Sequence, residues 1–165
     1  MSHAPAPLQD RFWRACERVL MDHTNPWELD EALVDWGYRL GPCAAQDLAG
    51  LDGVLAARGV DAPTPILPRM VAEGRLGKKG GWGYYRYPGG GGAVIDPLIE
   101  DLIREEAWFA KHPRRDLEGP ALVAQLHHLV APDILADPAG AERLLHFPLE
   151  RLAEIADVGR WSDAL

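Results

Sequence analysis

The first apolar pattern of the chain lies in residues 8–21. Its hydrophobic side chains recur every three or four positions, with charged residues between them; they are Leu8, Phe12, Ala15, Cys16, Val19 and Leu20. Because an α-helix turns once in about 3.6 residues, this spacing gathers the apolar side chains on one face. The pattern predicts an amphipathic helix over residues 8–21.

A second helix is predicted over residues 26–36 from the signals at its ends. Asn25 suits the N-cap, Pro26 suits the first helical position, and Glu28 places a negative charge in the first turn. Gly37 ends the pattern. A third helical stretch, residues 43–58, follows; helix-breaking residues delimit and interrupt it, namely Gly41, Pro42, Gly50 and Gly53.

Glycines and aromatic residues alternate in the next segment. After three closely spaced prolines and a brief helical turn at residues 70–73, residues 74–92 read GRLGKKGGWGYYRYPGGGG. The aromatic run at residues 84–87 has strand propensity, and four consecutive glycines suggest a flexible joint. We therefore expect a short extended aromatic segment, and a division of the chain into residues 1–95 and 96–165.

Three further helices are predicted after the glycines. Asp96 and Pro97 open one that runs to residue 111, a second covers residues 119–130, and a third covers residues 148–157. The chain is thus mostly helical. This pattern predicts an all-α fold class.

Composition and charge narrow the classes of function. The chain has 165 residues, 47% of them hydrophobic, which is enough for a buried core, and its net charge of -8 opposes binding to nucleic acid or to an anionic membrane. It has no apolar run of about 20 residues and no secretory pattern at its N-terminus. Cys16 and Cys43 form no CxxC motif, which fits core packing in a reducing compartment. We expect a cytoplasmic protein.

Two stretches, in this order, resemble the C-terminal helical domain of the 3-hydroxyacyl-CoA dehydrogenases. LGPCAAQDLAGLD at residues 40–52 is similar to a Gly-Pro-Phe-x-x-x-Asp turn and helix, and LPRMVAEGRLGKKGGWGYYRY at residues 67–87 to a Gly-Arg-x-Gly-x-Lys-Thr-Gly-x-Gly-Phe-Tyr stretch. The resemblance covers about residues 8–95; residues 96–165 are similar in position to the second helical repeat of long bacterial members.

The resemblance implies a helical bundle like the C-terminal domain of 6-phosphogluconate dehydrogenase, with a short aromatic extended segment. It also implies a structural motif made of Gly41, Pro42, Asp47, Gly77, Gly83, Tyr84 and Tyr85.

The departures from the family bear on catalysis. Family members begin with a Rossmann domain that binds NAD and holds a catalytic His-Glu pair, and no G-x-G-x-x-G occurs in these 165 residues. We therefore expect no cofactor to be bound by this chain alone, and NAD to act only through a partner. The family's substrate-facing Asn-Arg pair reads Asp10-Arg11 here. An ionised carboxylate accepts but cannot donate hydrogen bonds, whereas an Asn amide does both. Because Asp10 and Arg11 stand where the family approaches its substrate, the resemblance implies Asp10 as a candidate acid-base group and Arg11 as a candidate substrate contact.

The glycine-rich stretch has two interpretations, which can coexist. In the structural one, glycines at Gly77, Gly80, Gly81 and Gly83 permit tight turns and close backbone approach, and the aromatic rings close over the core or a partner. In the functional one, Lys78 and Lys79 join the amides of Gly80 and Gly81 in an anion-binding nest for a phosphate or a coenzyme A tail.

Other candidate residues favour structural roles. His127 and His128 are adjacent on an apolar helix, so their rings point about 100° apart and cannot easily share a metal; no metal site is predicted. The remaining carboxylates show no metal-ligand spacing. Six tryptophans exceed what a small core needs, which favours a homodimer or a hetero-complex; they are Trp13, Trp27, Trp36, Trp82, Trp108 and Trp161.

Three functions remain open. The first is a helical subunit of a split dehydrogenase, which supplies the substrate-facing wall and the association surface to an NAD-binding partner. The second is a non-catalytic scaffold or acyl-CoA binding module. The third is an enzyme that works without nicotinamide and uses Asp10.

Overall fold

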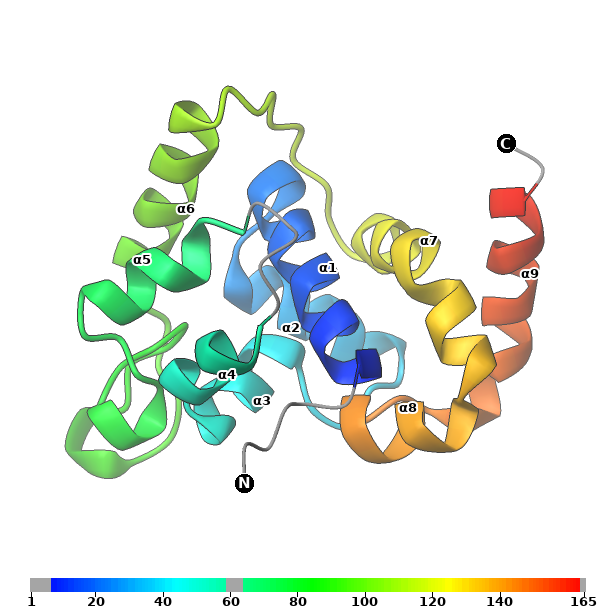
Figure 1. The fold of residues 1–165 in the computed structure, drawn as a ribbon, viewed down its shortest axis with the longest axis horizontal. Coiled ribbons are helices and arrows are strands. Elements are labelled where there is room, and N and C mark those ends of the chain that lie inside the picture. Colours follow the sequence, from blue (N-terminus) through cyan, green and yellow to red (C-terminus); the bar gives the residue numbers. More distant parts are fainter. Residues whose placement is uncertain (1–6, 59–63, 164–165) are drawn as a thin grey trace.

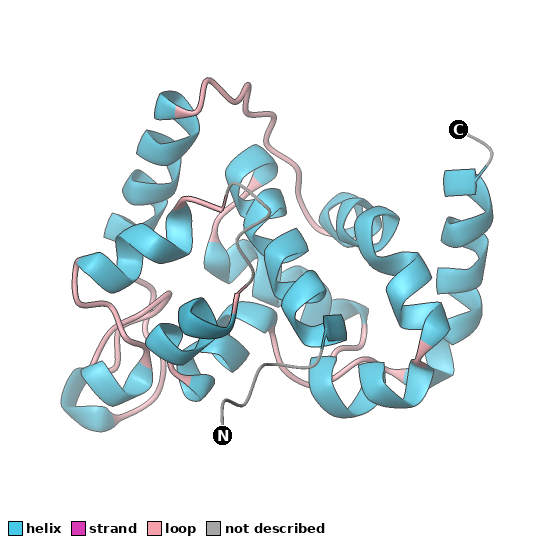
Figure 2. Cartoon of the chain, in the orientation of Figure 1, coloured by secondary structure: helices cyan, strands magenta, loops and turns pink. Residues whose placement is uncertain are grey.

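Helices make up most of the described chain, and none of the described residues forms a sheet (Figure 2). The computed structural model describes residues 7–58 and 64–163, with side chains described up to residue 158. In order, the α-helices are α1 (Pro7–His23), α2 (Pro26–Trp36), α3 (Pro42–Ala49), α4 (Leu51–Ala57), α5 (Ile66–Ala72), α6 (Pro97–Phe109), α7 (Pro120–Ala136), α8 (Pro138–Leu145) and α9 (Leu152–Asp163). This confirms the all-α fold class.

The predicted helix starts coincide with real caps. The Asn25 side chain accepts a hydrogen bond from the Glu28 amide at 2.9 Å and so opens α2. Asp96 caps α6 in the same way, through the Leu98 amide at 3.1 Å. Gly37 ends α2. Its φ of 137° is a backbone conformation that residues with a Cβ rarely adopt.

Several helix boundaries differ from the sequence-based ones. The third stretch breaks only at Gly50, whose φ is 96°, whereas Gly53 lies inside α4. Helix α5 begins earlier than expected, at Ile66, because the buried Glu17 carboxylate accepts hydrogen bonds from the Ile66 and Leu67 amides. This long-range cap satisfies two of the amides that the first turn of a helix leaves without a helical partner.

The C-terminal part contains more helix than predicted. Helix α7 continues past Pro132 to Ala136, because Ile134 beyond the proline is still buried in the core. Helix α8 was missed, although Asp137 caps it through the Gly140 amide at 3.0 Å. The third predicted helix begins at Leu152 as α9, after a 3-10 turn at Leu149–Arg151.

The aromatic segment is held by isolated bridges. Backbone pairs join Gly77 to Trp82, Trp82 to Arg86, and Arg86 to Val94, so the segment is extended but forms no strand. The glycine run begins with a 3-10 turn at Pro88–Gly90, which lets Val94 return to Arg86. Whether this joint is flexible stays a prediction.

Helix α1 lies near the centre of the molecule, and helices that follow the glycine run pack on it (Figure 1). Helices α6, α7 and α8 contact α1, and α9 packs on α7. The loop after α6 adds backbone hydrogen bonds to the end of α1, from the Arg115 amide to Asp22 and from the Leu117 amide to His23. Residues before and after the glycines therefore share one core, while the division at residue 95 stays a prediction.

Within the described ranges, no helix has both the length and the apolar character that a membrane crossing requires. The cytoplasmic location stays a prediction.

Candidate functional site

A buried carboxylate on α2 organises the start of α3. Asp30 accepts hydrogen bonds from the Cys43 amide at 2.8 Å and from the Ala44 amide at 3.0 Å, in the first turn of that helix. It also accepts one from the Tyr85 hydroxyl at 2.8 Å. Burial raises the pKa of Asp30 to about 6, against the opposing effect of these hydrogen bonds. A Cβ at Gly41 would collide with this carboxylate, so the Gly-Pro turn is a packing requirement.

A second buried carboxylate, on α3, holds the aromatic segment. Asp47 accepts hydrogen bonds from the Tyr84 amide at 2.9 Å, the Tyr85 amide at 3.0 Å and the Tyr87 hydroxyl at 2.7 Å. Burial raises its pKa to about 6 as well. We call Asp30 and Asp47, with the tyrosines that they bind, the carboxylate latch.

The glycines of the motif let the aromatic segment approach Asp47. A Cβ at Gly83 would collide with the Asp47 carboxylate, and one at Gly77, where φ is 96°, with the Asp47 backbone carbonyl. Tyr84 is fully buried. These contacts support the structural interpretation of the motif.

Arg75, the arginine of the same motif, forms an internal ion pair. Its side chain is buried and lies 2.9 Å from the Asp96 carboxylate, the cap of α6. It also donates to the Gly83 carbonyl at 2.9 Å and lies under the Trp82 ring, 4.0 Å from the centroid. The motif is therefore anchored to α6 as well as to α3.

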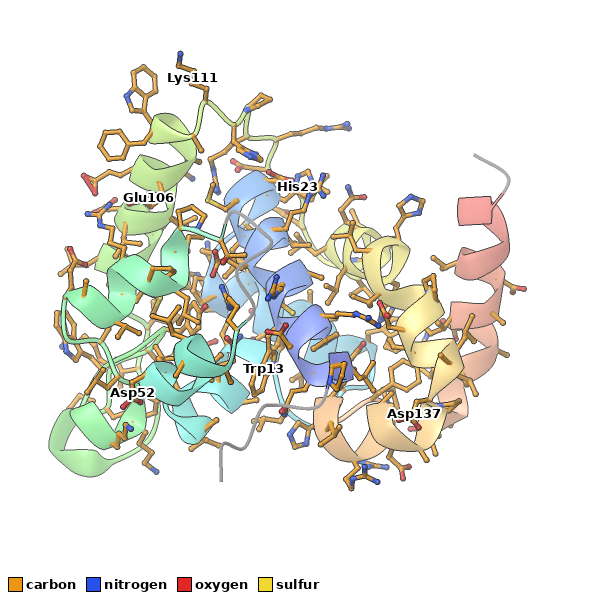
Figure 3. All side chains as sticks on the ribbon, viewed as in Figure 1. Trp13, His23, Asp52, Glu106, Lys111 and Asp137 are labelled. Atoms are coloured by element: carbon orange, nitrogen blue, oxygen red, sulfur yellow. The ribbon has the colours of Figure 1, made fainter. Side chains whose placement is uncertain are left out.

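The two lysines lie on the exposed turn of the motif. The Lys79 ammonium is 2.6 Å from the carboxylate of Asp52, which Figure 3 labels. Lys78 is exposed, and the Gly80 and Gly81 amides donate to backbone carbonyls inside the turn. Because these amides already donate hydrogen bonds inside the turn, an anion at this turn would be bound by the ammonium groups of Lys78 and Lys79. The anion site stays a prediction.

Asp10 and Arg11 lie together near the start of α1, but their side chains contact different neighbours. The Asp10 carboxylate is 3.0 Å from Nε of Arg14, one turn further along α1. The exposed Arg11 guanidinium donates to Asp133 on α7 at 3.1 Å. Their contacts are with α1 and α7, whereas those of Lys79 are with α4. The substrate roles of Asp10 and Arg11 stay predictions.

An apolar surface covers the outer side of α2 and the start of α3. It is a shallow depression of about 370 Å³, and its apolar lining consists of Trp27, Val34, Leu40, Ala44, Tyr85 and Ala93. Val94 and Ile95, which follow Ala93, are each about half exposed. We call this set the α2 face. The association surface expected from the tryptophans stays a prediction; the side chain of Trp161 lies outside the described residues.

His127 is part of a buried aromatic cluster. Its Nε2 lies 2.9 Å from the Tyr38 hydroxyl. The Trp36 ring packs edge-on against the His127 ring, with 4.5 Å between the ring centroids. Burial lowers the pKa of His127 to about 4, so the ring is neutral near pH 7. No group of three or more metal-binding side chains occurs among the residues with described positions.

Comparison with known proteins finds a family match for part of the chain. Residues 8–87 match the family model described as 3-hydroxyacyl-CoA dehydrogenase, C-terminal domain. The chain is 35% identical over 106 residues to a peroxisomal bifunctional enzyme of Danio rerio, and 33% identical over 93 residues to a peroxisomal fatty acid beta-oxidation multifunctional protein of Oryza sativa subsp. japonica. Each match covers 52% of this chain, and 15% and 13% of those proteins, respectively.

The family match covers the carboxylate latch and the glycine-aromatic motif. The matches to the relatives span only a small part of those proteins, so the activity of the whole proteins is not carried over to this chain. Over residues 8–87, the chain is similar to the C-terminal domain of the 3-hydroxyacyl-CoA dehydrogenases.

Proposed function

We propose that the chain acts in acyl-CoA metabolism as the helical part of a 3-hydroxyacyl-CoA dehydrogenase, together with a partner that carries the NAD-binding Rossmann domain. The family match over residues 8–87 supports the reaction class. The absence of a G-x-G-x-x-G motif from these 165 residues supports the need for a partner.

The α2 face is the observation that carries the proposal of a partner. The α2 face combines exposed aliphatic side chains with aromatic side chains, and the charged residues Glu31 and Arg39 also line the depression. An apolar centre with a polar rim is the usual composition of an association surface. The carboxylate latch keeps this face in shape, because Tyr85 belongs to both.

Reconstitution tests the proposal. The chain is purified from its own cells under gentle conditions, proteins that elute with it are identified, and NADH oxidation is measured with acetoacetyl-CoA. We expect no oxidation by the chain alone and oxidation after a co-eluting NAD-binding protein is added. Fixed stoichiometry of the two proteins would support the complex, and a homo-oligomer without dehydrogenase activity under any mixture would contradict it.

A pair of matched variants connects the activity to the α2 face. Val34→Asp places a charge in the centre of the face and should abolish both co-elution and oxidation. Leu48→Asp makes the same change at an exposed leucine of α3 that does not line the face, and should leave both intact. Equal behaviour of the two variants would remove the α2 face from the proposal.

The alternatives differ in what they bind and turn over. A scaffold or acyl-CoA binding module would bind without turnover. An enzyme that uses Asp10 would lose turnover in Asp10→Asn and would need no nicotinamide. Asp10 has one charged partner in the described part of the chain, Arg14, so its environment offers a counter-ion rather than a second acid-base group.

A further inference from the structure

A groove runs between α1 and α7, away from the α2 face. Its volume is about 450 Å³, and it is lined by Arg14, Ala15, Glu17, Arg18, Met21, Thr64, His112 and Leu129. Helices α1 and α7 pack side by side (Figure 1), and the loop after α6 closes one end through His112. The volume lies within the range of roughly 300–1,000 Å³ that is usual for small-molecule sites.

The floor of the groove is apolar. Ala15 and Met21 contribute it from α1, and Leu129 contributes it from α7. Met21 is buried, whereas Ala15 and Leu129 keep part of their surface open to the groove. Covering this surface with a hydrocarbon group would be favourable, at about 25 cal/mol for each Å² removed from water.

Two arginines form one edge of the groove. Arg14 and Arg18 are one turn apart on α1, so both guanidinium groups lie on the same side of the helix. The Arg14 side chain is only 17% exposed, yet its buried Nε lies 3.0 Å from Asp10 without a well-formed hydrogen bond. Within the described residues, its two terminal nitrogens have no hydrogen-bond acceptor. An anion in the groove would be a hydrogen-bond partner for them.

Arg18 also forms only a weak ion pair. Its nearest carboxylate oxygen, on Asp22, is 3.7 Å away, and the side chain is 66% exposed. The other oxygen of Asp22 lies 2.8 Å from Nδ1 of His112. An exposed pair of this kind contributes about 0–1 kcal/mol, so Arg18 can turn to a ligand at little cost.

The acidic residue of the lining does not compete for these cations. Glu17 is buried and its carboxylate is 2.7 Å from Arg58. It also accepts the Ile66 and Leu67 amides, both at 3.2 Å. Its charge is therefore used inside the fold.

We infer that this groove binds a small amphipathic carboxylate, with its anionic head on Arg14 and Arg18 and its hydrocarbon body on Ala15, Met21 and Leu129. The planar fork of donors on a guanidinium matches the two oxygens of a carboxylate, and the apolar floor accounts for the hydrocarbon body. The site needs only this chain, so it is independent of the proposed NAD-binding partner.

Titration of the full chain with decanoate, followed by calorimetry, tests the inference. We expect saturable binding of one decanoate per chain. Acetate, which lacks the hydrocarbon body, and 1-decanol, which lacks the charge, should each bind at least roughly tenfold more weakly. Decanol that binds as tightly as decanoate would overturn the role of the arginines.

Charge-removing variants locate the site. Arg14→Gln and Arg18→Gln should each weaken decanoate binding by about tenfold, because a hydrogen bond between charged groups contributes about 1.5–3 kcal/mol. Arg86→Gln removes an exposed guanidinium outside the groove and should bind decanoate like the original chain. If Arg14→Gln fails to fold, the exposed Arg18 decides alone. No saturable binding by the original chain, or unchanged binding by the arginine variants, overturns the inference.

Discussion

The Tyr85 hydroxyl lies 2.8 Å from the Asp30 carboxylate and joins the glycine-aromatic segment to α2 across 55 positions of sequence. The same tyrosine donates its backbone amide to Asp47 on α3. One residue thus links two buried carboxylates on two helices. Stability should therefore depend on the protonation of the latch and on the close approach of its glycines.

Asp30→Asn should destabilise the protein at pH 7 by about 1–3 kcal/mol, because an amide nitrogen cannot accept the hydrogen bond of the Ala44 amide. Urea denaturation followed by circular dichroism gives the free energy of unfolding. Asp35→Asn, at an exposed carboxylate on the same helix, should change it little. A latch variant as stable as this control would contradict the role of Asp30.

The original chain and Asp30→Asn also allow a test of how stability depends on pH. The folded pKa of Asp30, about 6, exceeds its usual value of 3.8, so the folded state holds a proton that the unfolded state releases. Stability from this group therefore falls as the pH rises from about 4 to about 6. The difference in unfolding free energy between the original chain and Asp30→Asn should narrow over this interval. A difference that widens would contradict the raised pKa.

His127 should show the opposite pH dependence. Its folded pKa of about 4 lies below the usual value of 6.5, so the unfolded state binds the proton more readily. Stability from this group is therefore lost as the pH falls from about 6.5 to about 4. The difference between the original chain and His127→Gln should therefore narrow toward low pH. His146→Asn, at a partly exposed histidine, is the control. If the free energy of unfolding changed with pH equally in the two variants, burial of His127 would be ruled out as the cause.

Gly83→Ala should destabilise the fold by about 3 kcal/mol or more, because the added Cβ would collide with the Asp47 carboxylate. Gly53→Ala provides a matched change in the exposed interior of α4, where a Cβ meets nothing within 4 Å. There we expect stabilisation by about 0.5–1 kcal/mol. Thermal unfolding of both variants measures the contrast, and a tolerated Gly83→Ala would refute the close approach.

Replacing both Lys78 and Lys79 by alanine separates the two interpretations of the glycine turn. If the turn binds an anion, coenzyme A binding should weaken while the melting temperature stays nearly constant, because both side chains are exposed. Binding that survives the double substitution would exclude the anion site. A large loss of stability would show that the lysines serve the fold instead.

Local signals in the sequence were sufficient to predict the starts of α2 and α6. Asn25 and Asp96 cap their helices through amides two or three residues away, so the relevant contacts lie within one turn. Asp137 has the same signal before α8 and was missed because the preceding helix was ended too early, before Pro132.

The long-range contacts could not be predicted from single positions. Glu17 caps α5 from 49 and 50 positions away, and Asp30 caps α3 although it lies on another helix. In the sequence, both look like ordinary charges on the polar side of a helix. The groove on α1 was missed for the same reason, since its apolar floor includes Leu129 from α7.

The central position of α1 also has a consequence for how the protein folds. Gln9 donates to the Leu144 carbonyl, and Arg114 donates to the carbonyls of Leu20 and Met21, so α1 is completed by residues 93 to 135 positions away in the sequence. Contacts at such separations slow folding, because a long loop must close before they form. The apolar side of α1 is therefore covered only late in folding, when α7 and α8 dock on it.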